Sequence, residues 1–156
     1  MHNDIFLLYD VVRDEVIVQH PTRMPVVPYV VNVNGFSFSD HVFVRMDKTT
    51  TPSLKTGFYE QITRGDITIL IKREKVIEEK INGIQLERKF IKRDKYYIVK
   101  DSVYYPVGSE KDILKVLKDS RNEIRQHLAD SNIRFKTDPD AAIIEAVEYY
   151  NQLSNH

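Results

Sequence analysis

The sequence predicts an α+β fold, in which an antiparallel β meander over about residues 5–107 is followed by two to three short C-terminal helices packed on the sheet. Up to about Gly108, short runs of alternating apolar and polar residues are separated by turn residues, which is the period of β-strands. After Gly108, apolar residues recur at helical spacing behind residues that typically cap helices. Because successive strands are joined by short turns, we expect them to pair antiparallel.

The β region begins with an apolar run at residues 5–9 and a second at 16–18, with a hairpin turn expected between them. Three prolines then remove backbone donors, so residues 21–28 are predicted to form a loop or a sheet edge. Further strand-like runs follow at 30–33, 36–38, 42–44, 58–62, 67–71, 96–99 and 103–107.

The charged stretch from residue 72 to 82 fits either a strand or a helix. The dipeptide Asn82-Gly83 follows it, and Asn-Gly is the strongest short-range hairpin signal, because both central residues of the favoured turn need positive φ. We therefore predict a strand here, which pairs with the apolar and charged run at 84–90.

Three helix starts are predicted in the tail. Ser109 is a natural N-cap, Ser120 with Glu123 matches the capping box, and Asp138-Pro139 is typical of a first helical turn. Helices this short need a surface on which to dock. We therefore expect the helical tail, residues 108–156, to form one compact domain with the β region, residues 1–107.

Composition excludes several classes of function. The 23 basic and 23 acidic residues cancel, whereas proteins that coat nucleic acid usually show a basic excess, so the composition disfavours nucleic acid as a partner. Cysteine is absent, which excludes disulfides, thiolate metal sites and cysteine nucleophiles.

The five histidines are scattered, without the spacing of a metal site. Asp40-His41 falls at an expected turn, and the acidic residues near the first hairpin are explained by turn formation. We predict no enzyme, no metal and no cofactor.

One stretch has a local charge excess. Residues 72–100 contain ten basic and five acidic residues, with aromatic residues among them. A strand face of this kind can bind an anionic polymer. The alternative is a solvated outer sheet face, on which lysines protect edge strands from aggregation. The candidate polyanion-binding residues are Lys89, Lys92, Arg93, Lys95 and Tyr96.

Several segments resemble a known family. The run Asp-Lys-Tyr-Tyr-Ile-Val-Lys-Asp-Ser-Val-Tyr-Tyr-Pro-Val at 94–107, the following 109–119, and Gly-Phe-Tyr-Glu at 57–60 are the segments that carry the resemblance. The chain is similar to a family of uncharacterised envelope or secreted proteins of Bacteroidota. The resemblance extends over nearly the whole chain and implies no catalytic residues.

The resemblance also bears on localisation. No apolar run approaches the ~20 residues that span a bilayer, and the first ten residues do not form a signal peptide. Such family members carry a signal peptide and further β structure ahead of their Leu-Tyr-Asp segment, here residues 8–10. The resemblance therefore implies an N-terminally truncated form of a periplasmic or secreted protein. Without such a leader the protein is expected to be cytoplasmic.

Two hypotheses for function follow. The first is a non-enzymatic structural or interaction module of the bacterial cell envelope, with a protein or polysaccharide as partner and self-association through an exposed sheet edge. The second is a cytoplasmic module that binds nucleic acid or another polyanion through residues 72–100.

Overall fold

The structure, a computed structural model, describes residues 6–19, 29–30 and 33–156. In the described residues, antiparallel β-sheets extend up to Val107 and three α-helices follow, which confirms the predicted α+β class and β meander. The predicted loop at 21–28 lies outside the described residues. The chain divides into two compact units, Met1–Tyr59 with Arg73–Asp94 and Glu60–Lys72 with Lys95–His156.

The second unit contains an antiparallel sheet with the strand order β11-β10-β7-β6. The central pair, β7 and β10, places Ile71 opposite Tyr96 and Ile69 opposite Ile98. These strands are therefore neighbours although they are not consecutive in the chain. The strands are β6 (Gly57–Arg64, from Glu60 onwards in this unit), β7 (Ile67–Lys72), β10 (Lys95–Lys100) and β11 (Val103–Val107).

Three helices complete this unit: α1 (Glu110–Val116), α2 (Arg121–Asp130) and α3 (Pro139–Ser154). Two predicted caps are confirmed, because the side chains of Ser109 and Asp138 accept hydrogen bonds from the backbone of Asp112 and Ala141. The predicted capping box at Ser120 is wrong, since that side chain makes no cap hydrogen bond. Ser120 closes a short 3₁₀ turn, Lys118–Ser120, with φ −127° and ψ 30°, outside the extended conformation usual for a capping residue.

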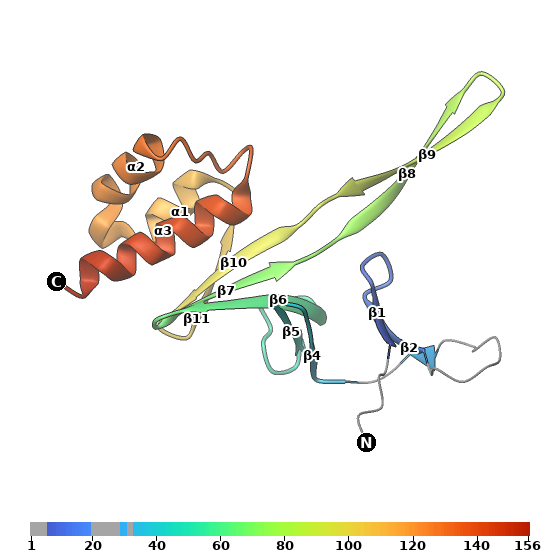
Figure 1. Cartoon of the computed structure of the whole chain (residues 1–156), viewed down its shortest axis with the longest axis horizontal. Helices are drawn as coiled ribbons and strands as arrows, with labels where there is room; N and C mark the ends of the chain where they lie inside the picture. Colours follow the sequence, from blue (N-terminus) through green and yellow to red (C-terminus); the bar gives the residue numbers. More distant parts are fainter. Residues whose placement is uncertain (1–5, 20–28, 31–32) are drawn as a thin grey trace. The chain divides into compact units, whose positions relative to one another are not determined.

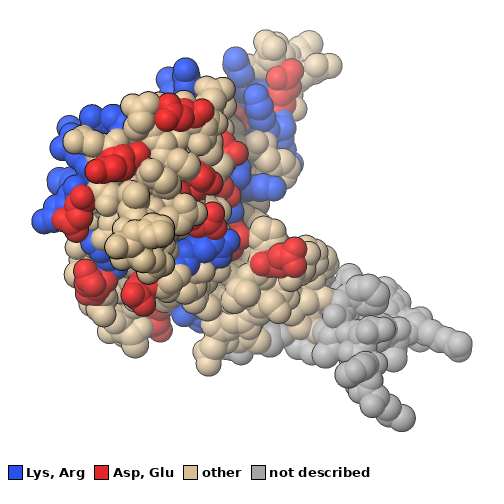
Figure 2. All heavy atoms as spheres, turned by 60° about the vertical axis from the view of Figure 1, so that its left-hand side comes forward, with Lys and Arg blue, Asp and Glu red and all other residues tan. Residues whose placement is uncertain are grey.

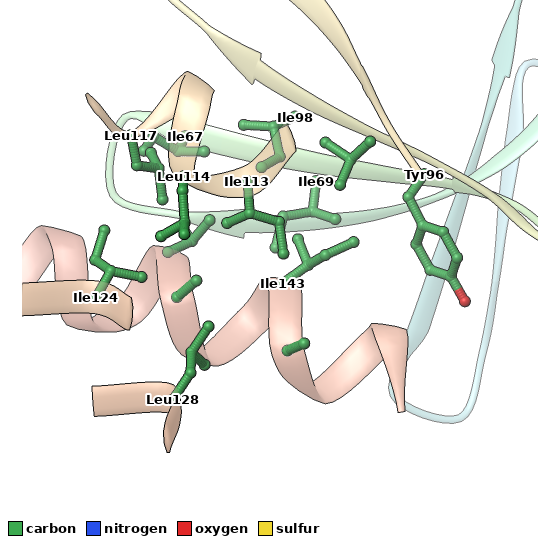
Figure 3. Packing of buried hydrophobic residues seen from close by; sticks show 14 of the residues in the cluster. Ile67, Ile69, Tyr96, Ile98, Ile113, Leu114, Leu117, Ile124, Leu128 and Ile143 are labelled. Atoms are coloured by element: carbon green, nitrogen blue, oxygen red, sulfur yellow. The ribbon is translucent and has the colours of Figure 1, made fainter. Parts of the chain in front are cut away.

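The core of the second unit lies between the sheet and the helices (Figure 3). Alternate residues of β7 face the helices because side chains alternate along a strand. Members from the sheet and from all three helices are fully buried, and they include Ile67, Ile69, Ile98, Ile113, Leu117, Ile124, Leu128 and Ile143. The helices therefore pack on the sheet, as the sequence predicted. Figure 1 shows the three helices grouped beside β10 and β11.

Polar contacts fix α3 against the turn between β6 and β7. The Arg64 side chain donates to Glu148 at 2.6 Å, and the Asn151 amide donates to the Arg64 carbonyl at 2.8 Å. Gly65 has φ +58° at this turn, a conformation that glycine adopts without strain. At the other end of α3, the Tyr96 hydroxyl donates to Asp140 at 2.7 Å.

The first unit contains a small sheet with the order β1-β2-β3, two hairpins and the start of β6. An aromatic cluster lies within it: Phe36 and Phe43 stack with ring centroids 4.7 Å apart, and Tyr9 packs against both. The strands are β1 (Phe6–Asp10), β2 (Glu15–Gln19), β3 (Tyr29–Val30), β4 (Gly35–Phe38), β5 (His41–Met46), β8 (Lys75–Asn82) and β9 (Gln85–Lys92).

Asp14 connects the turn between β1 and β2 to the start of β6. Its carboxylate accepts from the Tyr9 hydroxyl at 2.5 Å and from the Phe58 backbone N–H at 3.2 Å. Its φ is +57°, a left-handed conformation that aspartate tolerates better than most residues. Burial, the hydrogen bond to Asp14 and the neighbouring carboxylates raise the pKa of the Tyr9 phenol above its usual value.

Candidate functional site

The hairpin of β8 and β9 is an eight-residue antiparallel pair, drawn as a long two-stranded ribbon in Figure 1. The predicted strand over 72–82 is confirmed for Lys75–Asn82. The register pairs Asn82 with Gln85, so Gly83 and Ile84 form the turn, one residue later than predicted. Gly83 has φ +66°, which suits a turn in which only the first central residue needs positive φ. Glycine at that position explains the shift.

The hairpin has two chemically different faces. Residues directly opposite each other form a rung and point to the same side of the ribbon, and successive rungs alternate sides. On one side the Ile/Phe rung, the Glu/Arg rung and the Ile/Leu rung follow one another towards the tip. At the base of this side Lys75 pairs with Lys92; we call the part beyond this pair the apolar face, and its three rungs are Ile77 with Phe90, Glu79 with Arg88, and Ile81 with Leu86.

The large side chains of the apolar face are exposed. Ile77 is 47% exposed, Leu86 52%, Phe90 64% and Ile81 76%. Between the two hydrophobic rungs, the Arg88 guanidinium donates to Glu79 at 2.8 Å. Within the described part of the chain, this is the hairpin face on which hydrophobic side chains gather, and exposed apolar surface of this kind marks interaction sites.

The opposite side of the ribbon, the charged face, is polar over its outer three rungs. Acidic and basic residues lie opposite each other in two of them, and such cross-strand pairs stabilise a hairpin. The guanidinium of Arg93, just beyond β9, donates to Glu78 of this face at 3.0 Å. The rungs are Glu78 with Lys89, Lys80 with Glu87, and Asn82 with Gln85.

The base of the hairpin is held by Asp94. Its side chain is only 4% exposed and forms ion pairs with Arg73 at 2.7 Å and Lys92 at 3.2 Å. It also accepts from the Glu74 backbone N–H at 3.3 Å, and the Arg93 N–H donates to the Glu74 carbonyl at 2.8 Å. The buried charge is thus compensated by two cations, and the base is fixed while the outer rungs remain exposed.

The candidate polyanion-binding residues fall into both units. Lys89, Lys92 and Arg93 belong to the first unit, while Lys95 and Tyr96 begin β10 in the second. Lys92 and Arg93 form ion pairs with acidic neighbours. Tyr96 is 7% exposed, and its ring packs edge-on against Phe135 in the core. On the face that Figure 2 presents, basic and acidic side chains lie interspersed over the helices.

A cleft of about 830 Å³ lies in the helical unit beside the connection between α2 and α3. Three cationic side chains line it, Arg125, Arg134 and Lys136, and all three are exposed. Such a rim attracts small anions in general, but the exposed side chains do not form a shaped site.

A histidine–carboxylate pair also lies in this unit. His127 Nε2 is 2.7 Å from Glu145 Oε1, and its ring stacks on Tyr149 at 3.9 Å. The contact joins α2 to α3, which is a structural role. Among the described residues, no group of three or more His, Asp or Glu side chains is arranged to hold a metal ion.

Comparisons with known proteins give no assignment: no family model, no curated protein and no solved structure matches this chain. In the described part of the chain, no helix has the length and hydrophobicity needed to cross a membrane.

The apolar face was missed by sequence reasoning, which weighed the charges of this stretch. A signal existed in the spacing. Ile77 and Ile81 are four apart, and so are Leu86 and Phe90. Once Asn82-Gly83 fixes a hairpin, residues four apart share one side of the ribbon.

Proposed function

We propose that this chain is a non-enzymatic interaction module of the bacterial cell envelope, and that it contacts its partner through the apolar face of the β8–β9 hairpin. The observation that carries the proposal is the exposure of four large hydrophobic side chains on one side of a two-stranded ribbon. The envelope location rests on the resemblance of residues 57–60 and 94–119 to envelope proteins of Bacteroidota.

The free energy that burial would gain supports a role of the hairpin in binding a partner. An isolated two-stranded hairpin is only marginally stable in water. Covering the exposed part of Ile81 or Phe90 would gain about 1–2 kcal/mol for each side chain. A partner on this face therefore stabilises the hairpin and removes apolar surface from water.

The polyanion hypothesis has less support. The acids Glu78, Glu79 and Asp94 neutralise basic side chains of the hairpin within ion pairs. Single-stranded polyanions prefer a groove lined by unpaired cations and exposed aromatic rings. A hairpin whose basic side chains are held in ion pairs fits that description poorly.

The contact surface is tested by photo-crosslinking in the bacterium that encodes the protein. A photoreactive phenylalanine analogue replaces Ile81 on the apolar face or Gln85 on the charged face, in the full chain. We expect a discrete adduct, identified by mass spectrometry, from position 81 and little from position 85. Absence of adducts from both positions, or equal adducts from both, would contradict the proposal.

The envelope location is tested separately, by fractionation with an antibody to this chain and measurement of the intact mass. A protein in the envelope fraction is the expected result. A cytosolic protein would overturn the envelope part and return polyanion binding to consideration.

A further inference from the structure

We infer that the partner on the apolar face is a second copy of this chain, so that two β8–β9 hairpins pack face to face about a two-fold axis that runs along the ribbons. This inference rests on the proposed function for the identity of the contact surface, and it adds the occupant. A symmetric dimer needs a surface that is complementary to itself. The order of rungs on the apolar face meets that condition.

The two-fold operation exchanges the strands across the interface. An axis along the ribbon places β8 of one copy over β9 of the other while each rung keeps its level. Ile77 then faces Phe90 of the second copy, and Ile81 faces Leu86 of the second copy. Hydrophobic side chains meet hydrophobic side chains at both levels, which is the packing of two stacked sheets.

The middle rung supplies charge complementarity. It carries one acid and one base, Glu79 and Arg88, which already form an ion pair within the hairpin at 2.8 Å. The same operation sets Glu79 of one copy over Arg88 of the other, so four charges alternate in sign across the interface. An axis perpendicular to the ribbon would instead set Glu79 over Glu79, which is repulsive. The charges of the middle rung therefore favour the axis along the ribbon, and at the base, where Lys75 comes over Lys92 of the second copy, the charge of Lys92 is already balanced by Asp94.

The alternatives fit this face less well. A lipid surface offers no partner for two charged groups between the hydrophobic rungs, which would have to leave water. An unrelated protein must supply a base and an acid in the correct order, whereas a second copy always does. The chain has a formal net charge of zero, so two copies do not repel each other at long range.

The area of the apolar face limits the affinity of the proposed dimer. Eight residues of strand extend about 27 Å, and a two-stranded ribbon is only about 10 Å wide. Two such faces bury less than the ~1,200 Å² of a standard interface. We expect a dissociation constant on the order of 10–500 µM. In the cell, a high local concentration of the chain within an assembly would favour the dimer.

The test is sedimentation equilibrium of the full chain from about 5 µM to about 500 µM. Two matched variants place one new carboxylate on neighbouring residues of β9, Leu86→Asp on the apolar face and Gln85→Asp on the charged face. Both positions are exposed, so neither variant threatens the fold. We expect the wild type and Gln85→Asp to dimerise equally, and Leu86→Asp to bind itself at least tenfold more weakly.

A charge-swap experiment tests whether the two middle rungs face each other. Glu79→Arg alone and Arg88→Glu alone each give the middle rung a single sign, and each variant should remain monomeric. An equimolar mixture of the two should dimerise, because opposite charges face each other again. The double variant Glu79→Arg/Arg88→Glu restores both the internal ion pair and the complementarity, and it should dimerise like the wild type. A monomeric mixture of the two single variants, or a monomeric double variant, would overturn the proposed packing of middle rung on middle rung.

The outcomes separate this inference from the proposed function. Adducts from position 81 that contain two copies of this chain support both. Adducts that contain a different protein, together with a monomeric wild type at 500 µM, overturn the inference and leave the proposed function standing. A monomeric wild type without adducts overturns both.

Discussion

Replacing Asp14 tests how the first unit is held together. In Asp14→Ala, the Tyr9 hydroxyl loses an ionised acceptor at 2.5 Å, which is worth about 1.5–3 kcal/mol, and the Phe58 N–H loses its acceptor at 3.2 Å, which costs about 1–3 kcal/mol. Alanine at φ +57° adds about 1 kcal/mol. Allowing for partial replacement by water, we expect Asp14→Ala to lower the free energy of unfolding by about 3–5 kcal/mol.

Two further variants separate these causes. Asp14→Asn keeps a neutral acceptor and tolerates positive φ, so we expect a loss of only about 1–2 kcal/mol. Asp14→Gly also removes the carboxylate but adopts φ +57° without strain, so it should cost about 1 kcal/mol less than Asp14→Ala. The assay is urea unfolding followed by amide NMR signals of β1, β2 and β5, which monitors the first unit by itself. If Asp14→Gly is as stable as the wild type, the reasoning about the carboxylate is refuted.

Three other predictions concern stability. Ile143→Ala, at a fully buried position of α3, should lower the stability of the second unit by about 2–5 kcal/mol in urea unfolding, and a loss below 1 kcal/mol would contradict the described core. Hydrogen bonds from the Gly108 N–H and the Ser109 hydroxyl hold the pKa of Asp112 below its usual 3.8, so its contribution is present above that pH and lost as the pH falls. Asp112→Asn should therefore cost about 1 kcal/mol at pH 7 and less at pH 3 in thermal melts, and an equal cost at both would contradict this. Because the pKa of Tyr9 is raised, its contribution to stability is complete below the usual 10.0 and is lost as the pH rises above that value. Between pH 9 and 11 the wild type should therefore lose more free energy of unfolding than Tyr9→Phe. Parallel curves of stability against pH for the two proteins would contradict this.

Local signals in the sequence predicted much of this fold. The change from β period to helical period near Gly108 is local, and it correctly places the sheets before the helices. Ser109 and Asp138 cap helices because their side chains act on backbone groups two or three residues away, so the neighbouring sequence decides the outcome. Ser120 fails for the same reason, because the preceding 3₁₀ turn fixes its backbone conformation.

Long-range pairing was harder to predict. β7 lies beside β10 because the intervening chain forms its own hairpin. Nothing in the sequence of either strand indicates that a hairpin is inserted between them. The division into two units likewise depends on which segments pack together, which propensities do not encode.

The candidate site was the least predictable feature. Hydrophobic residues four apart, such as Ile77 and Ile81, share a face in a helix and also in a strand, so their spacing left the secondary structure ambiguous. The intervening charges drew attention to polyanions. Only the register, which pairs Glu79 with Arg88, shows that these charges neutralise each other within an apolar face.

The proposed contact surface is tested most directly by the accessibility of the apolar face in the cell. The chain contains no cysteine, so Ile81→Cys and Gln85→Cys each introduce one unique thiol, on the apolar and charged faces respectively. Both thiols should react with a small permeable maleimide at similar rates in dilute purified protein, because both positions are exposed. In the cell, we expect the thiol at position 81 to react at least fivefold more slowly than the thiol at position 85. Equal rates in the cell would mean that the apolar face stays open to solvent, and would contradict the account.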